Sequence, residues 1–379
     1  MRFAVVGNPG NRRVALFADA VRAAGLATPR VVPWLDVLRA GGAGFDADEI
    51  VRLDSPGEHP EVDGLLRGIP EATRVEGTGR WYARFTRAVR SLRGGVRLDD
   101  AGELAVMFDK RRCHATLAAA GVPVPDSPTS GPAAARITGW DDVRAVMRAH
   151  RMPRLFVKLA HGSSASGVLA VESSAGDRLR ATTSVELAPD GRLFNSLRVR
   201  RYERERDVAA IVDRLAPDGL HLERWLPKAA VGGRVADLRV LVVAGRATHA
   251  VVRTSTSPLT NLHLGGSRGD LDAVRDAVEA AGGRWADVLA VCERAAACFP
   301  RTLCVGVDLL PAVGWRRFAV GEVNAFGDLL PRLTGLPGSG AEGLDTYAAQ
   351  VAAVRRRHQQ HHRHEQHHQH RTGTTHVSA

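Results

Sequence analysis

The sequence predicts a mixed α/β (α+β) fold that is divided into more than one domain. The chain has 379 residues, more than a single hydrophobic core ordinarily organises. Apolar residues make up 44% of it and charged residues 25%, which is typical of a globular protein. Short apolar runs that read as strands alternate with amphipathic stretches at helical spacing.

Residues 1–100 are predicted to form the first α/β unit. RFAVVG (2–7) reads as a strand, residues 12–25 as a helix that ends at a glycine, and RVVPWLDVL (30–38) as a second strand. We interpret GNPGN (7–11) as a structural turn. The polar segment RLDSPGEHPE (52–61) lies near the expected carboxyl edge of a strand, so it is our candidate for recognition of an acceptor substrate.

Two further units are predicted, at residues 101–226 and 227–354. The first contains a helix at 110–120, the strand RLFVKLA (154–160), a small-residue loop and the strand HLERWL (221–226). The second contains the hairpin 237–254, one helix over 271–299, the hairpin 302–326 and a terminal helix. The tail, residues 355–379, is rich in His and Arg and is predicted to be disordered.

Net charge and cysteine usage narrow the possible classes of protein. The formal charge is +11, of which the tail carries +4, so a basic nucleic-acid-binding protein is one alternative. No recognised nucleic-acid motif accompanies this charge, and aromatic residues are only 5%. The four cysteines form no CxxC pair, no apolar run reaches about 18 residues, and the N-terminus does not read as a signal peptide. We therefore expect a cytoplasmic protein with reduced thiols and no membrane partner.

The strongest chemical signal is a set of oxygen-bearing side chains in the last hairpin. Asp308 ends the strand of GVDLL, and Glu322 and Asn324 lie two residues apart in GEVNAFGD, on one face of a strand. If the two strands pair through a turn near Gly314, Asp308 lies across from them. Carboxylate and amide oxygens suit Mg²⁺, so we predict a metal site at Asp308, Glu322 and Asn324.

A second signal is the loop that follows Lys158. Its small residues let backbone N–H groups approach phosphate oxygens, and the lysine adds charge. The predicted nucleotide-binding residues of this loop are Gly162, Ser163, Ser164, Ser166 and Gly167. Lysine is scarce here, since only Lys110, Lys158 and Lys228 occur among 52 basic residues, which makes each a candidate for a role that needs a point charge.

The order of these motifs resembles the ATP-grasp superfamily, and most closely its branch of ribosomal-protein glutamate ligases (RimK) and glutathione synthetases. The resemblance covers roughly residues 100–350 and is carried by Lys110 at the start of a helix, FVK, LERWL, DLRVLVV, AVVR and GVDLL…GEVNAFGD. It implies an ATP-grasp fold of two α+β lobes preceded by a Rossmann-like domain at 1–100.

By position, the resemblance implies that Lys110 and Lys158 hold ATP, with Glu223 and Leu226 at the adenine. Asp237 is the candidate for the ribose, while Arg239 and Arg253 would act on the phosphoryl group being transferred. The implied cofactors are ATP and Mg²⁺, with Mn²⁺ as a possible replacement.

The implied reaction is an ATP-dependent ligation, in which a small-molecule or peptide carboxylate becomes an acyl phosphate that an amine or another nucleophile attacks. Three alternatives stay open: an ATP-grasp kinase, the nucleic-acid-binding protein, and a nucleotide-binding regulator without turnover. The intact acidic set argues against the regulator.

Overall fold

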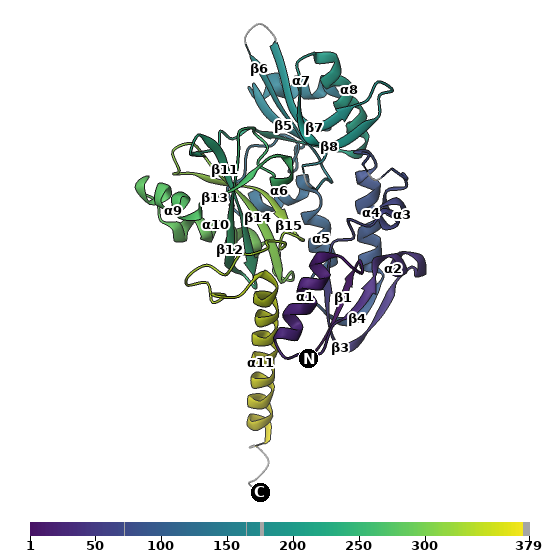
Figure 1. The fold of residues 1–379 in the computed structure, drawn as a ribbon, viewed down its shortest axis with the longest axis vertical. Coiled ribbons are helices and arrows are strands. Elements are labelled where there is room, and N and C mark those ends of the chain that lie inside the picture. Colours follow the sequence, from purple (N-terminus) through teal and green to yellow (C-terminus); the bar gives the residue numbers. More distant parts are fainter. Residues whose placement is uncertain (72, 164, 175–177, 374–379) are drawn as a thin grey trace.

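The computed structural model describes residues 1–71, 73–163, 165–174 and 178–373, with the backbone alone for residues 361–373. It contains three β-sheets, each with its own helices (Figure 1). A chain of three such units agrees with the α/β (α+β) class predicted from the sequence.

The first sheet is fully parallel, with strand order β2-β1-β3-β4. Its elements are β1 (Arg2–Gly7), α1 (Arg12–Ala23), β2 (Arg30–Pro33), α2 (Trp34–Ala40), β3 (Ala43–Leu53), α3 (Pro60–Arg67), α4 (Thr78–Arg90) and β4 (Leu92–Arg97). The predicted strand 30–38 is wrong in its second half, because the chain turns into helix α2 directly after Pro33. Proline fixes φ and lacks the N–H that a strand needs, but it is tolerated just before a helix.

The second sheet is antiparallel, with order β8-β7-β6-β5-β9. Helices α7 and α8 pack on it and share its hydrophobic core. Its unit consists of α5 (Ala101–Met107), α6 (Lys110–Ala119), α7 (Trp140–Ala149), β5 (Arg154–Leu159), β6 (Leu169–Ser174), β7 (Arg178–Leu187), β8 (Leu193–Tyr202), α8 (Glu205–Leu215), η1 (Ala216–Asp218) and β9 (Leu220–Arg224).

The third sheet is also antiparallel, with order β13-β12-β11-β14-β15 and β10 beside β11. Its elements are β10 (Ala230–Val231), β11 (Arg234–Val243), β12 (Arg246–Ser255), η2 (Leu262–Leu264), β13 (Ser267–Gly269), α9 (Leu271–Ala280), α10 (Trp285–Ala297), β14 (Cys304–Pro311), β15 (Phe318–Asn324) and α11 (Thr346–Gly373). The single helix predicted over 271–299 is two helices, because Gly282 and Gly283 interrupt it: Gly282 adopts φ +81°.

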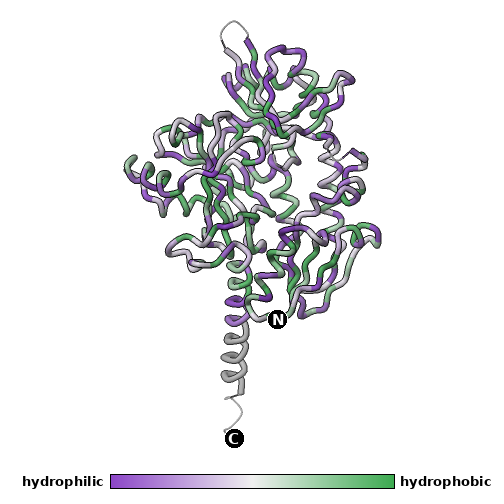
Figure 2. The backbone as a smooth tube through the Cα atoms, in the orientation of Figure 1, coloured by the Kyte–Doolittle hydropathy of each residue, from purple (hydrophilic) through white to green (hydrophobic). Residues whose placement is uncertain are grey.

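One hydrophobic core connects the first and third units with α5 and α6, and a separate core holds the second sheet with α7 and α8. One cluster runs from Trp34 and Phe85 in the first unit, through Leu104, to Val240 and Phe299 in the third. The second sheet and its helices form another cluster, which includes Val143, Leu155 and Ile211. Apolar stretches follow the interior strands, and polar stretches follow the outer loops and helices (Figure 2). The cleft described below lies between these two bodies.

The C-terminal helix α11 includes residues 355–373, the described part of the tail (355–379) that was predicted to be disordered. The helix continues to Gly373, while residues 374–379 lie outside the described part of the chain. No proline or glycine interrupts residues 346–372, and arginine and glutamine are good helix formers, so the helix that Thr346 begins has no local stop signal. Among the described residues, no helix has the length and apolar character needed to span a membrane.

A buried carboxylate after β4 gives the fold a testable pH dependence. Asp99 is buried, its Oδ2 accepts a hydrogen bond from Leu53 N at 3.1 Å, and burial raises its pKa to about 7. The folded protein therefore keeps a proton that the unfolded chain, with an ordinary carboxyl pKa of 3.8, has lost. Stability should consequently fall as the pH rises from about 4 to about 7.

We expect Asp99→Asn to remove this loss of stability, on the order of 2 to 4 kcal/mol at pH 8. Urea unfolding of both proteins at pH 5 and pH 8 measures it. Asp100→Asn is the matched control, because Asp100 caps α5 and asparagine caps equally well. An equal dependence on pH in wild type and Asp99→Asn would contradict the assignment.

Candidate active site

Strand register in the third sheet brings the predicted acidic and basic residues onto one face. Asp308 on β14 pairs with Glu322 on β15, as the hairpin prediction required, and with Arg239 on β11. On the other side of β11, Asp237 pairs with Arg253 of β12. Side chains at opposed positions point to the same side of a sheet, so the four strands present one charged row.

Asp308 is the centre of this row. Its carboxylate is bound by Arg239 Nε, by Arg239 Nη2 at 3.0 Å and by Arg253 Nη2 at 3.1 Å. Burial alone would raise the pKa of Asp308, but the two guanidinium groups outweigh it and hold that pKa well below its usual range. Asp308 is therefore ionised at neutral pH.

Lys110 connects the row to the small-residue loop. It is the first residue of α6, whose N-terminus is capped by the Asp109 carboxylate. Its Nζ donates to Glu322 Oε1 at 2.6 Å and to Gly162 O at 2.7 Å. Burial lowers the pKa of Lys110, and the stronger opposing effect of Glu322 leaves that pKa raised, so the ammonium group stays charged.

Lys158 occupies the opposite wall, on β5 of the second sheet. Its Nζ binds Glu223 Oε1 on β9, and His221 Nε2 lies 3.5 Å from the other oxygen of Glu223. Burial opposes ionisation of Glu223, but the charge of Lys158 and the hydrogen bond from His221 lower its pKa to about 2.

Asp237 has more partners than a free ribose ligand would have. It is buried, and its carboxylate accepts hydrogen bonds from Arg253 Nε at 2.7 Å, from Lys228 Nζ at 3.4 Å and from Thr260 Oγ1. Burial lowers the pKa of Lys228, with Asp237 opposing that shift. A role for Asp237 in orienting Lys228 and Arg253 fits this geometry better than direct contact with a ribose.

Two adjoining cavities collect most of the predicted residues. The first, about 110 Å³, is lined among others by Lys110, Lys158, Gly162, Ser166, Glu223, Leu226, Asp237, Arg253, Asp308 and Glu322. The second, about 480 Å³, shares Lys110, Arg253, Asp308 and Glu322 with the first and adds Ser163, Arg239 and Asn324. The side chains predicted at widely separated positions thus surround one continuous cleft.

Two residues of the predicted loop stand apart from these cavities. Ser164 lies outside the described residues. Gly167 lines neither cavity. It has φ +68°, and a Cβ there would clash with Leu159, so backbone conformation and packing explain this glycine.

Three residues that line the cleft were missed from the sequence. Lys228 and Thr260 bind Asp237 and line the first cavity. Tyr82, on α4 of the first unit, lines the second cavity, with its ring 4.9 Å from that of Phe108. The scarcity of lysine was a usable signal for Lys228. Tyr82 carried none, because its helix read as a packing helix.

The donor set of the charged row matches what a divalent cation requires. Asp308 and Glu322 face each other on neighbouring strands, and Asn324 follows on the same strand as Glu322. The set offers hard oxygen ligands, which Mg²⁺ prefers. No group of three His, Cys, Asp or Glu side chains in a metal-binding arrangement occurs in the described residues, so an all-protein cage is not available there. This fits Mg²⁺, which typically uses one or two carboxylates and completes its shell with phosphate and water.

Comparisons with known proteins bear on the fold. No family model matches the sequence, and no curated protein does. The D-cycloserine synthetase DcsG matches with a TM-score of 0.55 and 18% identity over 94% of this chain and 99% of that chain. The ATP-grasp ligase PsnB, complexed with Mg and ADP, gives a TM-score of 0.49, 17% identity and coverages of 93% and 97%. A RimK domain ATP-grasp protein from Sphaerobacter thermophilus gives 0.49, 15%, 93% and 98%.

Fold and cleft together define a protein of two α+β lobes that enclose a charged cavity. A parallel α/β unit precedes these lobes in the sequence. The chain has the ATP-grasp fold, as the resemblance of its motifs implied.

Proposed function

We propose that the protein is an ATP-dependent ligase that activates a carboxylate as an acyl phosphate for attack by an amine or another nucleophile. The observation that carries this proposal is the pairing of Asp308 with Glu322 at the floor of a cleft. Around these two carboxylates stand Lys110, Arg239 and Arg253, and Lys158 lies on the opposite wall. Such a set supplies oxygen ligands for a metal and fixed positive charge for phosphate groups.

The roles of the residues follow from their positions. Lys158 and Lys110 would bind the ATP phosphates from the two sides of the cleft, with Gly162 and Ser163 offering backbone N–H groups. Ser166, whose N–H donates to Ser163 O at 2.9 Å, would hold the shape of the loop. Asp308, Glu322 and Asn324 would hold Mg²⁺, or Mn²⁺ in its place. When bound, the metal would neutralise charge on the phosphates. The ion pairs of Asp308 and Glu322 would keep these carboxylates oriented until the ligands enter.

The chemical step requires positioning and not a protein nucleophile. An oxygen of the substrate carboxylate attacks the γ-phosphorus, the bond to the β-phosphate oxygen breaks, and ADP leaves. Arg239 and Arg253 would stabilise the charge that develops on the phosphoryl oxygens. An amine or another nucleophile then attacks the acyl carbon and displaces inorganic phosphate.

An assay of ADP and phosphate with Mg²⁺ and ATP tests this function across pairs of carboxylates and nucleophiles. A ligase releases both products only when both co-substrates are present. A kinase releases ADP with a stable phosphorylated product, and the regulator releases neither. Steeply salt-dependent binding to DNA or RNA without ADP release would favour the nucleic-acid alternative.

The role of Lys158 gives a separate prediction. We expect Lys158→Met to weaken ATP binding at least about tenfold, because hydrogen bonds to charged groups contribute roughly 1.5 to 3 kcal/mol. Titration calorimetry with a non-hydrolysable ATP analogue measures it. Arg154→Met is the matched control, since Arg154 lies on the same strand but is exposed. Equal affinities in the two variants would remove Lys158 from the nucleotide site.

The remaining proposals concern domain boundaries and location. We propose units at 1–100, 101–226 and 227–354, since the three sheets fall within these ranges. A cytoplasmic location is supported by four free cysteines, three of them buried.

A further inference from the structure

The first sheet has a feature that marks ligand sites in open α/β sheets. In the order β2-β1-β3-β4, the chain leaves β1 toward one side and later returns to β3 on the other side of β1. Ligands bind at such switch points, outside the carboxyl ends of the two strands. The loops that leave β1 and β3 meet there: Asn8 Nδ2 donates to Pro56 O and to Gly57 O, both at 2.9 Å. The crevice between these two loops opens into the larger of the two cavities, whose lining also includes Asp308 and Glu322.

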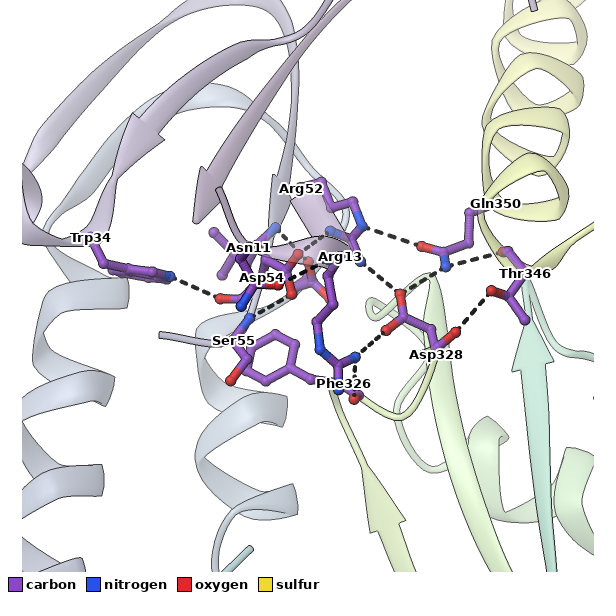
Figure 3. A network of polar contacts seen from close by, with 12 residues as sticks. Asn11, Arg13, Trp34, Arg52, Asp54, Ser55, Phe326, Asp328, Thr346 and Gln350 are labelled. Carbon is purple, nitrogen blue, oxygen red and sulfur yellow. Dashed lines mark hydrogen bonds and ion pairs between the residues drawn. The ribbon is translucent and has the colours of Figure 1, made fainter. Parts of the chain in front are cut away.

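Arg13 lines the crevice and is held in one position. Its Nη1 donates to Phe326 O at 3.0 Å and to Asp328 Oδ1 at 2.9 Å (Figure 3). Its side chain is only 17% exposed. Among the residues that the structure describes, Nε and Nη2 of Arg13 have no recorded hydrogen-bond partner. A guanidinium fixed on one side and open on the other is pre-organised for a carboxylate.

The start of helix α1 strengthens this site for anions. Arg13 is the second residue of a twelve-residue helix whose N-cap is Asn11. The N–H groups at a helix N-terminus carry partial positive charge, which favours a negative group beside them. Arg13 and the N-terminus of the helix therefore both favour the binding of an anion.

Glu58 supplies the opposite charge on the neighbouring loop. Asn11 Nδ2 donates to Glu58 Oε2 at 3.1 Å, so one amide connects the N-cap of α1 with this carboxylate. Glu58 is exposed and has φ +67°, a left-handed conformation that is strained for a residue with a side chain. Strain of this kind persists where surrounding structure imposes it, and it is concentrated at functional sites.

Asp63 and Arg67 also line this cavity, but their hydrogen-bonding groups are already engaged with protein partners. Asp63 accepts hydrogen bonds from Arg67 Nε at 3.1 Å and from Trp81 Nε1 at 2.9 Å. Arg67 also donates to Glu76 O at 3.1 Å. These groups satisfy one another, which leaves Arg13 and Glu58 to bind a ligand among the described charged side chains that the first unit contributes to this cavity.

We propose that the crevice binds the α-carboxylate and α-ammonium groups of an amino-acid substrate, with the carboxylate on Arg13 and the ammonium on Glu58. The side chain of the bound amino acid then extends along the cavity toward Asp308 and Glu322. This inference rests on the proposed ligase function and gives the class of one of its substrates.

The test is calorimetric binding to the full chain with Mg²⁺ and a non-hydrolysable ATP analogue present. The probes are the free amino acids glutamate, aspartate, ornithine, lysine, serine and alanine, each beside its N-acetyl derivative and its α-amide. We expect at least one free amino acid to bind about tenfold or more tightly than both derivatives. If no free amino acid binds, or if a derivative binds equally well, the inference is wrong.

Variants assign the two charges. Glu58→Gln should weaken the free amino acid about tenfold and leave the N-acetyl derivative unaffected, whereas Arg13→Gln should weaken both but not the α-amide. Glu61→Gln and Arg12→Gln are matched controls, since both residues are exposed and neither lines the cavity. Glu58→Gly relieves the strained φ, so its melting temperature should be unchanged or higher while amino-acid affinity falls. Unchanged selectivity in Glu58→Gln would overturn the assignment.

The proposed ligase function and the proposed amino-acid site can be disproved separately. If the ATP analogue binds and, in a separate assay with ATP, only carboxylates that lack an amine support ADP release, the ligase is retained and the amino-acid site is overturned. If the wild-type protein does not bind the nucleotide at all, the proposed ligase function is itself wrong.

Discussion

Glu322→Gln is expected to lower ADP formation by at least about 100-fold while the protein stays folded. Removing one pre-organised electrostatic group from an active site typically costs 10² to 10³ in rate. Glu322 faces Asp308 across the β14–β15 pair and lies 2.6 Å from Lys110 Nζ. Glutamine keeps the volume of the side chain and an oxygen that accepts from Lys110. It loses the negative charge with which Glu322 would bind the metal.

The measurement combines the ADP assay with a thermal melt and nucleotide titration of the same variant. Glu279→Gln, an exposed position on α9, is the control for a generic loss of one negative charge. Activity of Glu322→Gln at the wild-type rate would exclude Glu322 from the metal site. A rate loss accompanied by unfolding would identify the Lys110 contact as structural.

The pairing of Asp308 with Glu322 was predictable because it depends on local geometry. Two apolar strands separated by a short turn fix their own register, and period two fixes which side chains share a face. The contacts of Asp308 with Arg239 and Arg253 were not predicted. They require the predicted hairpin β11–β12 to lie with β11 beside β14, a pairing of distant strands that follows from tertiary packing and has no local signature.

Lys228 shows where an argument from composition went unused. Because lysine is scarce in this sequence, each of the three lysines was a candidate for a site residue. Only Lys110 and Lys158, however, lie in recognisable motifs. Lys228 reaches the cleft through an isolated bridge between its own backbone and Ala312, far along the chain. A contact between residues 228 and 312 has no expression in local periodicity, so the sequence offered no means of placing the side chain.

The first unit was predicted in class but not in detail. Strand β3 (Ala43–Leu53) was missed, because its AGFDADE half carries charged and small residues, and only Phe45 and Glu49 of that half are buried. Without β3, neither the order β2-β1-β3-β4 nor the switch point that it creates could be considered from the sequence. GNPGN forms a turn, as interpreted from the sequence, with Asn11 N donating to Asn8 O at 3.1 Å; the Asn8 side chain also binds the loop 54–59, which was not predicted.

The second large effect is expected at Asp328, on stability. Its buried carboxylate accepts from Arg52 Nη2 at 2.6 Å, from Arg13 Nη1 at 2.9 Å and from Gln350 Nε2 at 3.0 Å (Figure 3). Burial alone would raise the pKa of Asp328, but Arg52 and Arg13 outweigh it and lower that pKa, so the group is charged at neutral pH. One carboxylate thus joins the first unit to helix α11.

Asp328→Ala should lower the free energy of unfolding by roughly 3 to 5 kcal/mol, because it leaves the buried guanidinium of Arg52 with Asp54 as its one remaining carboxylate. Urea denaturation at pH 7 measures the change. Asp345→Asn, on the exposed N-terminal side of the same helix, should be nearly neutral, since asparagine also accepts the bonds from Tyr347 N and Ala348 N. Asp328→Asn keeps the size of the side chain and should lie between them. If Asp328→Ala costs no more than the Asp345 control, the network contributes nothing measurable to stability, and Arg13 would have to be fixed by Phe326 O alone.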